Sequence, residues 1–276
     1  MISFNKNQKN IKIGKYIFLI IITIISLFPI VLVLSSSFKN ESEIFDFPFH
    51  LIPRQIIFSN FIRLSRNFPL YIWNSVKLTS IIAVLQLFSA STGGYVFSKL
   101  KWKGRNFIFG LYLASMMIPL QAVTIPQFII MRNLNLYDTH AAIILLSTFT
   151  AFGTFLIRQY FLSVPDTYLE AARIDGAREW TIFFNIMLPM AKPVLVTQAV
   201  LSFRFFWNDF FTPLIYLTTP ELKTLPLGMT DFVREQYVYW GPQMAAALIS
   251  IIPVLIIFMF GQRYFIEGVS SSGLKG

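Results

Sequence analysis

The sequence predicts an all-α integral membrane protein with six transmembrane helices and both termini in the cytoplasm. Hydrophobic residues make up 55% of the 276 residues and charged residues only 13%, whereas a soluble domain carries about 25% charged residues. Six apolar runs approach or exceed the about 20 residues that cross a bilayer as a helix. The basic residues are also distributed unequally between alternate loops, as they are in membrane proteins.

The first predicted span is Tyr16–Leu34, which follows a basic tail. Such a tail also precedes cleaved signal peptides, but their apolar core is only about 7–15 residues long, and Ser35-Ser36-Ser37 is a poor cleavage site. We therefore predict an uncleaved helix. The other predicted spans are Leu78–Phe97, Phe107–Met131, Ala141–Ile157, Pro193–Thr219 and Gly241–Gly261.

Several spans contain residues that interrupt or bend helices. Gly93-Gly94 lies in the second span, Pro119 and Pro126 in the third, and Pro253 in the sixth. Membrane helices tolerate such residues where neighbouring groups satisfy the backbone. They indicate close packing and kinks, although a flexible translocation path would use the same residues.

The distribution of Lys and Arg predicts the topology. Fourteen fall in the N-terminal tail, in loops 98–106 and 158–192 and in the C-terminal tail, while seven fall in loops on the opposite side. Cytoplasmic loops carry the excess of basic residues, so both termini are predicted inside. The same rule explains the net charge of +10 without nucleic-acid binding, for which there is no motif.

Several kinds of chemistry lack the residues they need. The chain has no Cys, which excludes disulfides, thiolate metal sites and Cys nucleophiles. Its two histidines, His50 and His140, both lie in predicted loops, which argues against a His-based metal site. The spans contain no catalytic constellation, and the chain contains no phosphate-binding loop of the G-x-x-x-x-G-K-[ST] type. We predict no catalytic residue and no metal site.

The sequence between the fourth and fifth spans predicts a helix–turn–helix. Ser163 and Asp166 have the spacing of a capping box at the start of a first helix. Gly176 is a natural stop for that helix, since glycine adopts positive φ readily. A second helix is predicted from Ala177 until Pro189 ends it.

The charges of this loop are compatible with two interpretations. A helix lying on lipid favours a basic face, whereas balanced charge and small residues suit a protein partner. In this loop the two signs are balanced, with Arg158, Arg173, Arg178 and Lys192 against Asp166, Glu170, Asp175 and Glu179.

The same loop resembles the EAA loop of ABC importer permeases. Three residues separate Glu170-Ala171-Ala172 from Gly176, and nine separate Gly176 from Ile186-Met187-Leu188-Pro189. The resemblance implies a coupling helix that inserts into a groove of an ATP-binding subunit. The residues that it assigns to this coupling are Glu170, Ala171, Ala172, Asp175, Gly176 and Ala177.

The resemblance extends over most of the chain. Trp207–Phe210 with Pro213-Leu214, and then Thr224–Gly228, are similar to segments of carbohydrate-importer permeases. The C-terminal sequence is similar in Gln262–Phe265, Gly268 and Lys275-Gly276, but Glu267 and Ser270-Ser271-Ser272 depart from the common form. This is the pattern of the second permease in maltose-type sugar importers. It implies a type I ABC importer permease fold, with a single transmembrane domain over 1–276, a permease core over 72–262 and the EAA loop over 163–189.

The resemblance also implies a set of partners in a bacterial cell membrane. They are a second, homologous permease that completes a heterodimer, two copies of an ABC ATPase, and an extracellular or periplasmic substrate-binding protein. Membrane lipid is a further partner of this chain. ATP and Mg would be bound by the ATPase and no cofactor by this chain. A secondary transporter or channel is the alternative, and an intramembrane enzyme is a third.

Two further sets of candidates follow. Arg204, Asn208 and Asp209 are candidates for the translocation path, because a cation in mid-span costs about 2.5–3.5 kcal/mol and needs a partner. That partner is the second permease, a backbone carbonyl or an acidic saccharide; Asp209 is poorly placed on the helix to pair with it. In the outer loop, Tyr237, Tyr239 and Trp240 are candidates for contact with the binding protein, or else belong to the interfacial aromatic belt.

Overall fold

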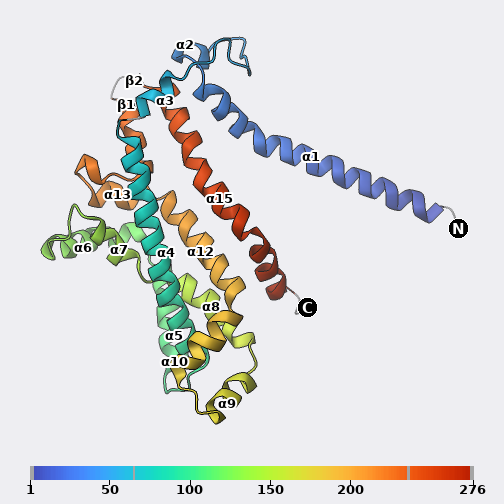
Figure 1. The fold of residues 1–276 in the computed structure, drawn as a ribbon, viewed down its shortest axis with the longest axis vertical. Coiled ribbons are helices and arrows are strands. Elements are labelled where there is room, and N and C mark those ends of the chain that lie inside the picture. The colour runs from blue at the N-terminus through green and yellow to red at the C-terminus, as the bar shows by residue number, and fades with distance from the viewer. Residues whose placement is uncertain (1–2, 65, 235–236, 274–276) are drawn as a thin grey trace. The chain divides into compact units, whose positions relative to one another are not determined.

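The computed structural model describes residues 3–64, 66–234 and 237–273, which are mostly helical (Figure 1). These residues form two compact units. The first contains residues up to 67 together with 229–252, and the second contains 68–228 together with the residues from 253 onward.

The first unit contains one long helix, several short elements and the first part of a second long helix. It consists of α1 (Ser3–Ser37), α2 (Glu41–Ile44), α3 (Ser59–Leu64), the 3₁₀ turn η4 (Met229–Phe232), the strands β1 (Val233–Arg234) and β2 (Tyr237–Val238), and the start of α15 (Trp240–Gly273). The two strands pair antiparallel, with Val233 opposite Val238.

The N-terminus of α15 is held by residues that lie far earlier in the chain. The carboxylate of Glu41 accepts hydrogen bonds from the backbone N–H groups of Trp240 and Gly241, both at 3.1 Å. A carboxylate at this position satisfies orphan amides and complements the helix dipole. A Cβ on Gly241 would lie 2.5 Å from Asn60 Oδ1, so α3 approaches this helix as closely as glycine allows.

The second unit contains the remaining elements. They are α4 (Phe68–Ser98), α5 (Arg105–Ala114), η1 (Ser115–Met117), α6 (Leu120–Asn133), α7 (His140–Ser147), α8 (Ala151–Ser163), α9 (Thr167–Ile174), α10 (Glu179–Ile182), the π-helical turn η2 (Phe183–Met187), α11 (Leu188–Met190), α12 (Lys192–Trp207), α13 (Phe211–Tyr216), η3 (Pro220–Leu222), α14 (Leu225–Gly228) and the rest of α15.

Helices α4, α8 and α12 pack side by side in this unit, and α9 and α10 lie at one end of them (Figure 1). The pair Gly93-Gly94 lets α4 approach α8 closely. A Cβ on Gly93 would lie 3.1 Å from Thr154, and one on Gly94 would lie 3.0 Å from Ile157. The predicted role of these glycines in packing is therefore confirmed, since small residues let membrane helices approach.

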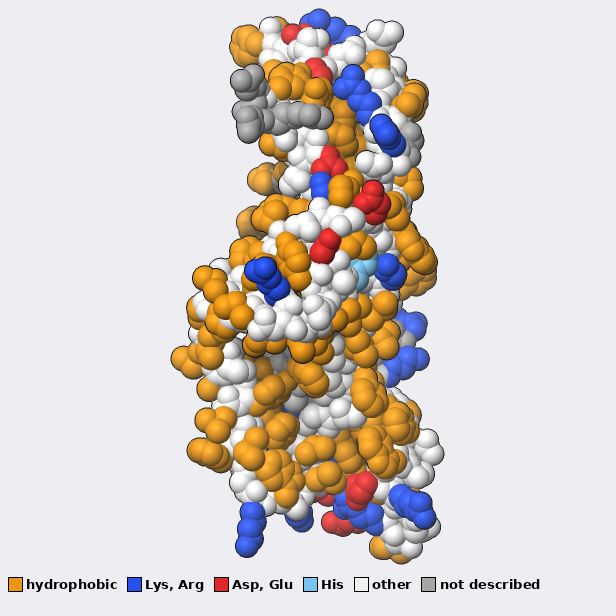
Figure 2. Space-filling model, turned by 90° about the vertical axis from the view of Figure 1, so that its left-hand side faces the viewer, with side chains coloured by type: hydrophobic (Ala, Val, Ile, Leu, Met, Phe, Trp, Pro, Cys, Tyr) orange, Lys and Arg blue, Asp and Glu red, His pale blue; other side chains and the backbone are white. Residues whose placement is uncertain are grey.

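Among the described residues, four helices are long and apolar enough to span a membrane, and up to six if each of two bent pairs counts as one span. The four are Gly14–Ser37, Phe68–Ser98, His140–Ser163 and Trp240–Arg263. On the face shown in Figure 2, hydrophobic side chains cover much of the lower half, and charged side chains lie at the lower end, where α9 and α10 are, and in the upper half. This distribution suits an apolar solvent around the helices.

The predicted third span, Phe107–Met131, is sharply bent, and the bend lies at Pro119, one of the two prolines from which a kink was expected. Helices 105–117 and 120–133 meet at an angle of 98°, with Ile118 extended between them (φ −82°, ψ 116°). Proline disfavours helical geometry in the residue before it. Pro119 therefore ends one helix and begins the next.

The predicted fifth span, Pro193–Thr219, is wrong in its second half. Helix α12 ends at Trp207, and a new short helix, α13, begins at Phe211. Asp209 Oδ1 accepts a hydrogen bond from the Thr212 N–H at 3.1 Å, so its carboxylate starts this second helix. The partner of α12 in a bent span is instead the helix 179–190, at an angle of 78°.

Candidate functional site

The loop between α8 and α12 forms the predicted helix–turn–helix. The first helix is α9, and α10, η2 and α11 form the second. Gly176 has φ +82°, as predicted for the stop. Its N–H donates to Arg173 O at 3.0 Å, and the N–H of Ala177 donates to Ala172 O at 2.9 Å, which together make a Schellman motif.

The predicted ends of these helices need correction. Ser163 is the last residue of α8, and its hydroxyl donates to Tyr160 O at 2.7 Å; the N-cap position of the next helix is Asp166, whose side chain makes no capping hydrogen bond. The first helix begins at Thr167 instead. The second begins at Glu179 and continues past Pro189 to Met190, because proline in the first turn of the short helix α11 needs no N–H donor.

Both ends of α9 are tied to the C-terminal end of α4, one by Tyr95 in its last turn and the other by Lys99, which directly follows the helix. At the first end, Lys99 Nζ donates to Val164 O at 2.6 Å and pairs with Asp166 Oδ1 at 2.5 Å. At the other, Glu179 accepts from Arg173 Nε at 2.9 Å and from the Tyr95 hydroxyl at 2.5 Å. The hydrogen bond from Lys99 lowers the pKa of Asp166, which keeps the carboxylate ionised at neutral pH.

The face of α9 that points away from this attachment is exposed. Leu169 is buried and anchors the helix in the core, while Ala172 and Ala177 pack against that core. Glu170, Ala171 and Asp175 are exposed, and so is Ile174, whose side chain is 86% accessible. An apolar residue that protrudes from a helix turn is the kind of group that a partner surface covers.

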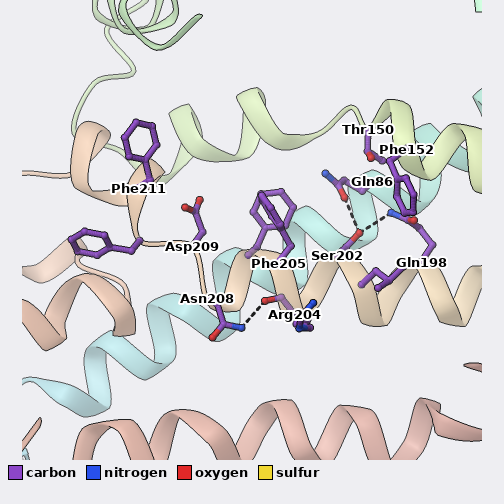
Figure 3. Close-up of a pocket in the computed structure, with 13 residues that line it drawn as sticks. Gln86, Thr150, Phe152, Gln198, Ser202, Arg204, Phe205, Asn208, Asp209 and Phe211 are labelled. Atoms are coloured by element: carbon purple, nitrogen blue, oxygen red, sulfur yellow. Dashed lines mark hydrogen bonds between the residues drawn. The ribbon is translucent and has the colours of Figure 1, made fainter. Parts of the chain in front are cut away.

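The predicted path residues line a pocket of about 1070 Å³ in the second unit (Figure 3). Arg204 extends from α12 and is exposed, and its guanidinium has no partner among the described residues. Asn208 donates to the backbone carbonyl of Arg204 at 2.8 Å. Asp209 points elsewhere and begins α13. As predicted, Arg204 and Asp209 do not form an ion pair.

The polar part of this pocket includes three residues that the sequence did not identify. Gln86 Nε2 donates to Ser147 O at 2.7 Å, while Gln86 Oε1 accepts from Ser202 Oγ at 2.7 Å. Ser202 in turn accepts from Gln198 Nε2 at 2.9 Å. Figure 3 shows these side chains from α4 and α12 meeting beside Phe152 of α8. The spacing of Gln198 and Ser202, one helical turn apart in an apolar run, was the available signal.

The three aromatic candidates of the outer loop, all in the first unit, differ in their surroundings. Tyr237 is 51% exposed and meets Tyr239 edge to face at 5.0 Å. Tyr239 also lies beneath the guanidinium of Arg63. Trp240 packs edge to face on Phe45 at 5.6 Å. Packing therefore accounts for Trp240, and Tyr237 is the most accessible of the three.

Part of the C-terminal sequence pattern falls on residues or side chains that the structure does not describe. Lys275 and Gly276 lie beyond the described residues, and the side chains from Tyr264 onward, including Glu267 and Ser270–Ser272, are likewise outside it. Within the described part of the chain, no group of three or more His, Cys, Asp or Glu residues is placed to hold a metal ion.

Comparisons with known proteins cover nearly the whole chain. Residues 87–271 match the family "Binding-protein-dependent transport system inner membrane component". The arabinooligosaccharides transport system permease protein AraQ of Halalkalibacterium halodurans is 36% identical over 260 residues, covering 92% of this chain and 93% of the relative. The inner membrane ABC transporter permease protein YcjP of Escherichia coli (strain K12) is 31% identical, covering 96% and 97%.

A solved structure is also similar. A chain from the crystal structure of a bacterial ABC transporter involved in the import of the acidic polysaccharide alginate superposes with a TM-score of 0.83. Its sequence is 28% identical, and the match covers 94% of this chain and 98% of that one.

Proposed function

This chain belongs to the family of binding-protein-dependent transport system inner membrane components, and we propose that it is a permease subunit of an ATP-driven importer of oligosaccharides. It acts in a bacterial cell membrane with both termini in the cytoplasm. A homologous permease completes the path, and two copies of an ABC ATPase bind ATP and Mg. An external binding protein delivers the substrate. This chain itself performs no catalysis and holds no cofactor.

Helix α9 is the coupling element of this assembly. The observation that carries the proposal is the complete EAA spacing on a helix that is exposed on one side and tied to α4 on the other. ATP binding closes the ATPase dimer and moves α9. The path then changes from inward-facing to outward-facing through rigid-body motion of the helices.

The experiment is ATP hydrolysis by the purified complex in proteoliposomes. We expect a substrate-loaded binding protein to stimulate hydrolysis, and Glu170→Lys to abolish that stimulation because it reverses a charge on the exposed face of α9. Lys103→Glu reverses a charge in another loop at the same end of the unit and serves as the control. Equal stimulation in the Glu170→Lys complex would contradict the coupling role.

The substrate includes acidic oligosaccharides. Arg204 lines a pocket, its guanidinium has no partner among the described residues, and the planar fork of this group suits a carboxylate in two-point contact. The similarity to the alginate importer also supports an acidic substrate, because alginate is an acidic polysaccharide.

We expect Arg204→Gln to reduce uptake of an alginate oligosaccharide by about tenfold or more, the scale of a hydrogen bond to a charged group. Uptake of a neutral arabinooligosaccharide should be unchanged. Lys192→Gln removes a charge from the same helix, away from the pocket, and should change neither. Equal loss of both substrates would make Arg204 a structural residue.

Tyr237 is the residue of the outer loop that we expect to contact the binding protein, since it is the most accessible of the three aromatic candidates. Tyr237→Ser should lower the stimulation of ATPase activity by the binding protein and leave basal hydrolysis unchanged. Tyr16→Ser, which removes an exposed tyrosine from α1, is the matched control. Full stimulation in the Tyr237→Ser complex would assign that ring to the aromatic belt.

A further inference from the structure

The two attachments of α9 begin one helical turn apart at the C-terminal end of α4. Tyr95 lies in the last turn of α4, and Lys99 directly follows the helix, with its backbone N–H donating to Tyr95 O at 2.8 Å. Residues with this spacing are neighbours on one side of a helix. Lys99 holds the segment before α9 through Val164 O and Asp166. Tyr95 reaches the other end through Glu179.

Glu179 uses its two carboxylate oxygens for two different helices. Its Oε1 accepts from Arg173 Nε of α9 at 2.9 Å, and its Oε2 accepts from the hydroxyl of Tyr95 at 2.5 Å. Only 5% of Tyr95 is exposed, and its ring packs against Phe161 and Phe183. The hydroxyl is therefore fixed in place by the core, and the carboxylate joins a rigid point on α4 to α9.

Helix α4 also reaches the pocket. Gln86 lies nine residues before Tyr95, which is about 14 Å along a helix at 1.5 Å per residue. Its side chain bonds Ser202 of α12 and the backbone of Ser147. If movement of α9 shifts α4, the shift therefore also changes the geometry of the hydrogen bond between Gln86 of α4 and Ser202 of α12.

We propose that Tyr95 and Lys99 are positioning residues that attach the coupling helix to α4, so that movement of α9 is delivered to the pocket through α4. This inference rests on the proposed coupling function. Helix α8 is the competing route, because the hydroxyl of Tyr160 donates to Met190 O at 2.6 Å and links α8 to the far end of the second helix of the loop.

The test compares two identical substitutions. Tyr95→Phe and Tyr160→Phe each remove one hydroxyl and keep the ring, in the full complex in proteoliposomes with an alginate oligosaccharide and its binding protein. We expect Tyr95→Phe to reduce stimulated ATPase activity and uptake about three- to tenfold, the scale of one hydrogen bond. Tyr160→Phe should change them little. Basal hydrolysis and the amount of ATPase subunit bound should be normal in both.

A double-substitution cycle separates positioning from general stability. If Tyr95 acts through Glu179, then Tyr95→Phe combined with Glu179→Gln should be no worse than the stronger single change, because both remove the same link. Lys99→Met removes the other attachment and should add to either. If Tyr95→Phe fails to assemble, Lys99→Met alone must show the uncoupling.

Three results would overturn the proposal. The first is normal stimulation of ATPase activity in both Tyr95→Phe and Lys99→Met. The second is a loss of stimulation in Tyr160→Phe equal to that in Tyr95→Phe. The third is a fully additive loss in the variant that combines Tyr95→Phe with Glu179→Gln. A wild-type complex without stimulated hydrolysis would overturn the proposed coupling function itself. The two failures are therefore distinguishable.

Discussion

Replacing Gly176 by Val is expected to abolish transport and stimulated ATPase activity together, at normal membrane levels of the protein. Gly176 has φ +82°, and a Cβ at this position would meet nothing within 4 Å. The cost is therefore confined to the backbone, about 1–3 kcal/mol for a residue held in a sparsely populated region. The turn relaxes, the Schellman hydrogen bonds are lost and α9 changes its orientation, while the spans still insert.

Gly104→Val is the matched control for this experiment. Gly104 also has positive φ, +84°, and open space around its Cα, but it precedes α5 and not the coupling loop. We expect the same strain there with little loss of coupling. Measurements of uptake, stimulated hydrolysis and membrane abundance check both variants, and full activity in Gly176→Val would remove the coupling role from this turn.

Replacing Gly228 by Ala is expected to destabilise the fold of the second unit. A Cβ on Gly228 would lie 2.1 Å from Cδ2 of Tyr71, and Tyr71 is 2% exposed in α4, so its ring has nowhere to move. Overpacking of this kind costs typically 1–3 kcal/mol and occasionally more. We expect lower expression and a lower Tm in detergent.

Gly110→Ala is the control for Gly228→Ala, because a Cβ on Gly110 meets nothing within 4 Å and lies inside α5. Alanine is about 1 kcal/mol better than glycine in a helix interior, so this variant should be neutral or slightly stabilising. A Tm for Gly228→Ala equal to that of the wild type would show that the segment shifts to accommodate the methyl group.

The sequence predicted the parts of the fold that depend on local chemistry. Apolar runs located the long helices, and Gly176 predicted a turn whose φ is positive. The break after Trp207 was not predicted because it depends on the hydrogen bond from the Thr212 N–H to Asp209 at the start of a new helix. The size of the bend at Pro119 was not predicted because hydropathy says nothing about the direction of a helix axis. The candidate path residues Arg204, Asn208 and Asp209 were identified from charge and polarity in an apolar run.

Other parts of the site depend on contacts between residues far apart in the chain. Ser163 has the chemistry of a cap, but it is the last residue of α8, four residues before α9 begins at Thr167. The link from Tyr95 to Glu179 joins residues 84 positions apart, and the chain of Gln86, Ser202 and Gln198 crosses 116 positions. No local pattern specifies these pairings, because they form only when α4, α8 and α12 pack.

The capping of α15 by Glu41 has a consequence for the order in which the protein is made. The carboxylate and the two amides that it binds are 199 and 200 residues apart. At about 5–20 residues per second, a ribosome needs roughly 10–40 s to make the intervening chain. During that interval Glu41 is satisfied only by water or by a transient partner, and the first unit closes after α15 has emerged. The earliest segments of the chain are thus among the last to reach their final contacts.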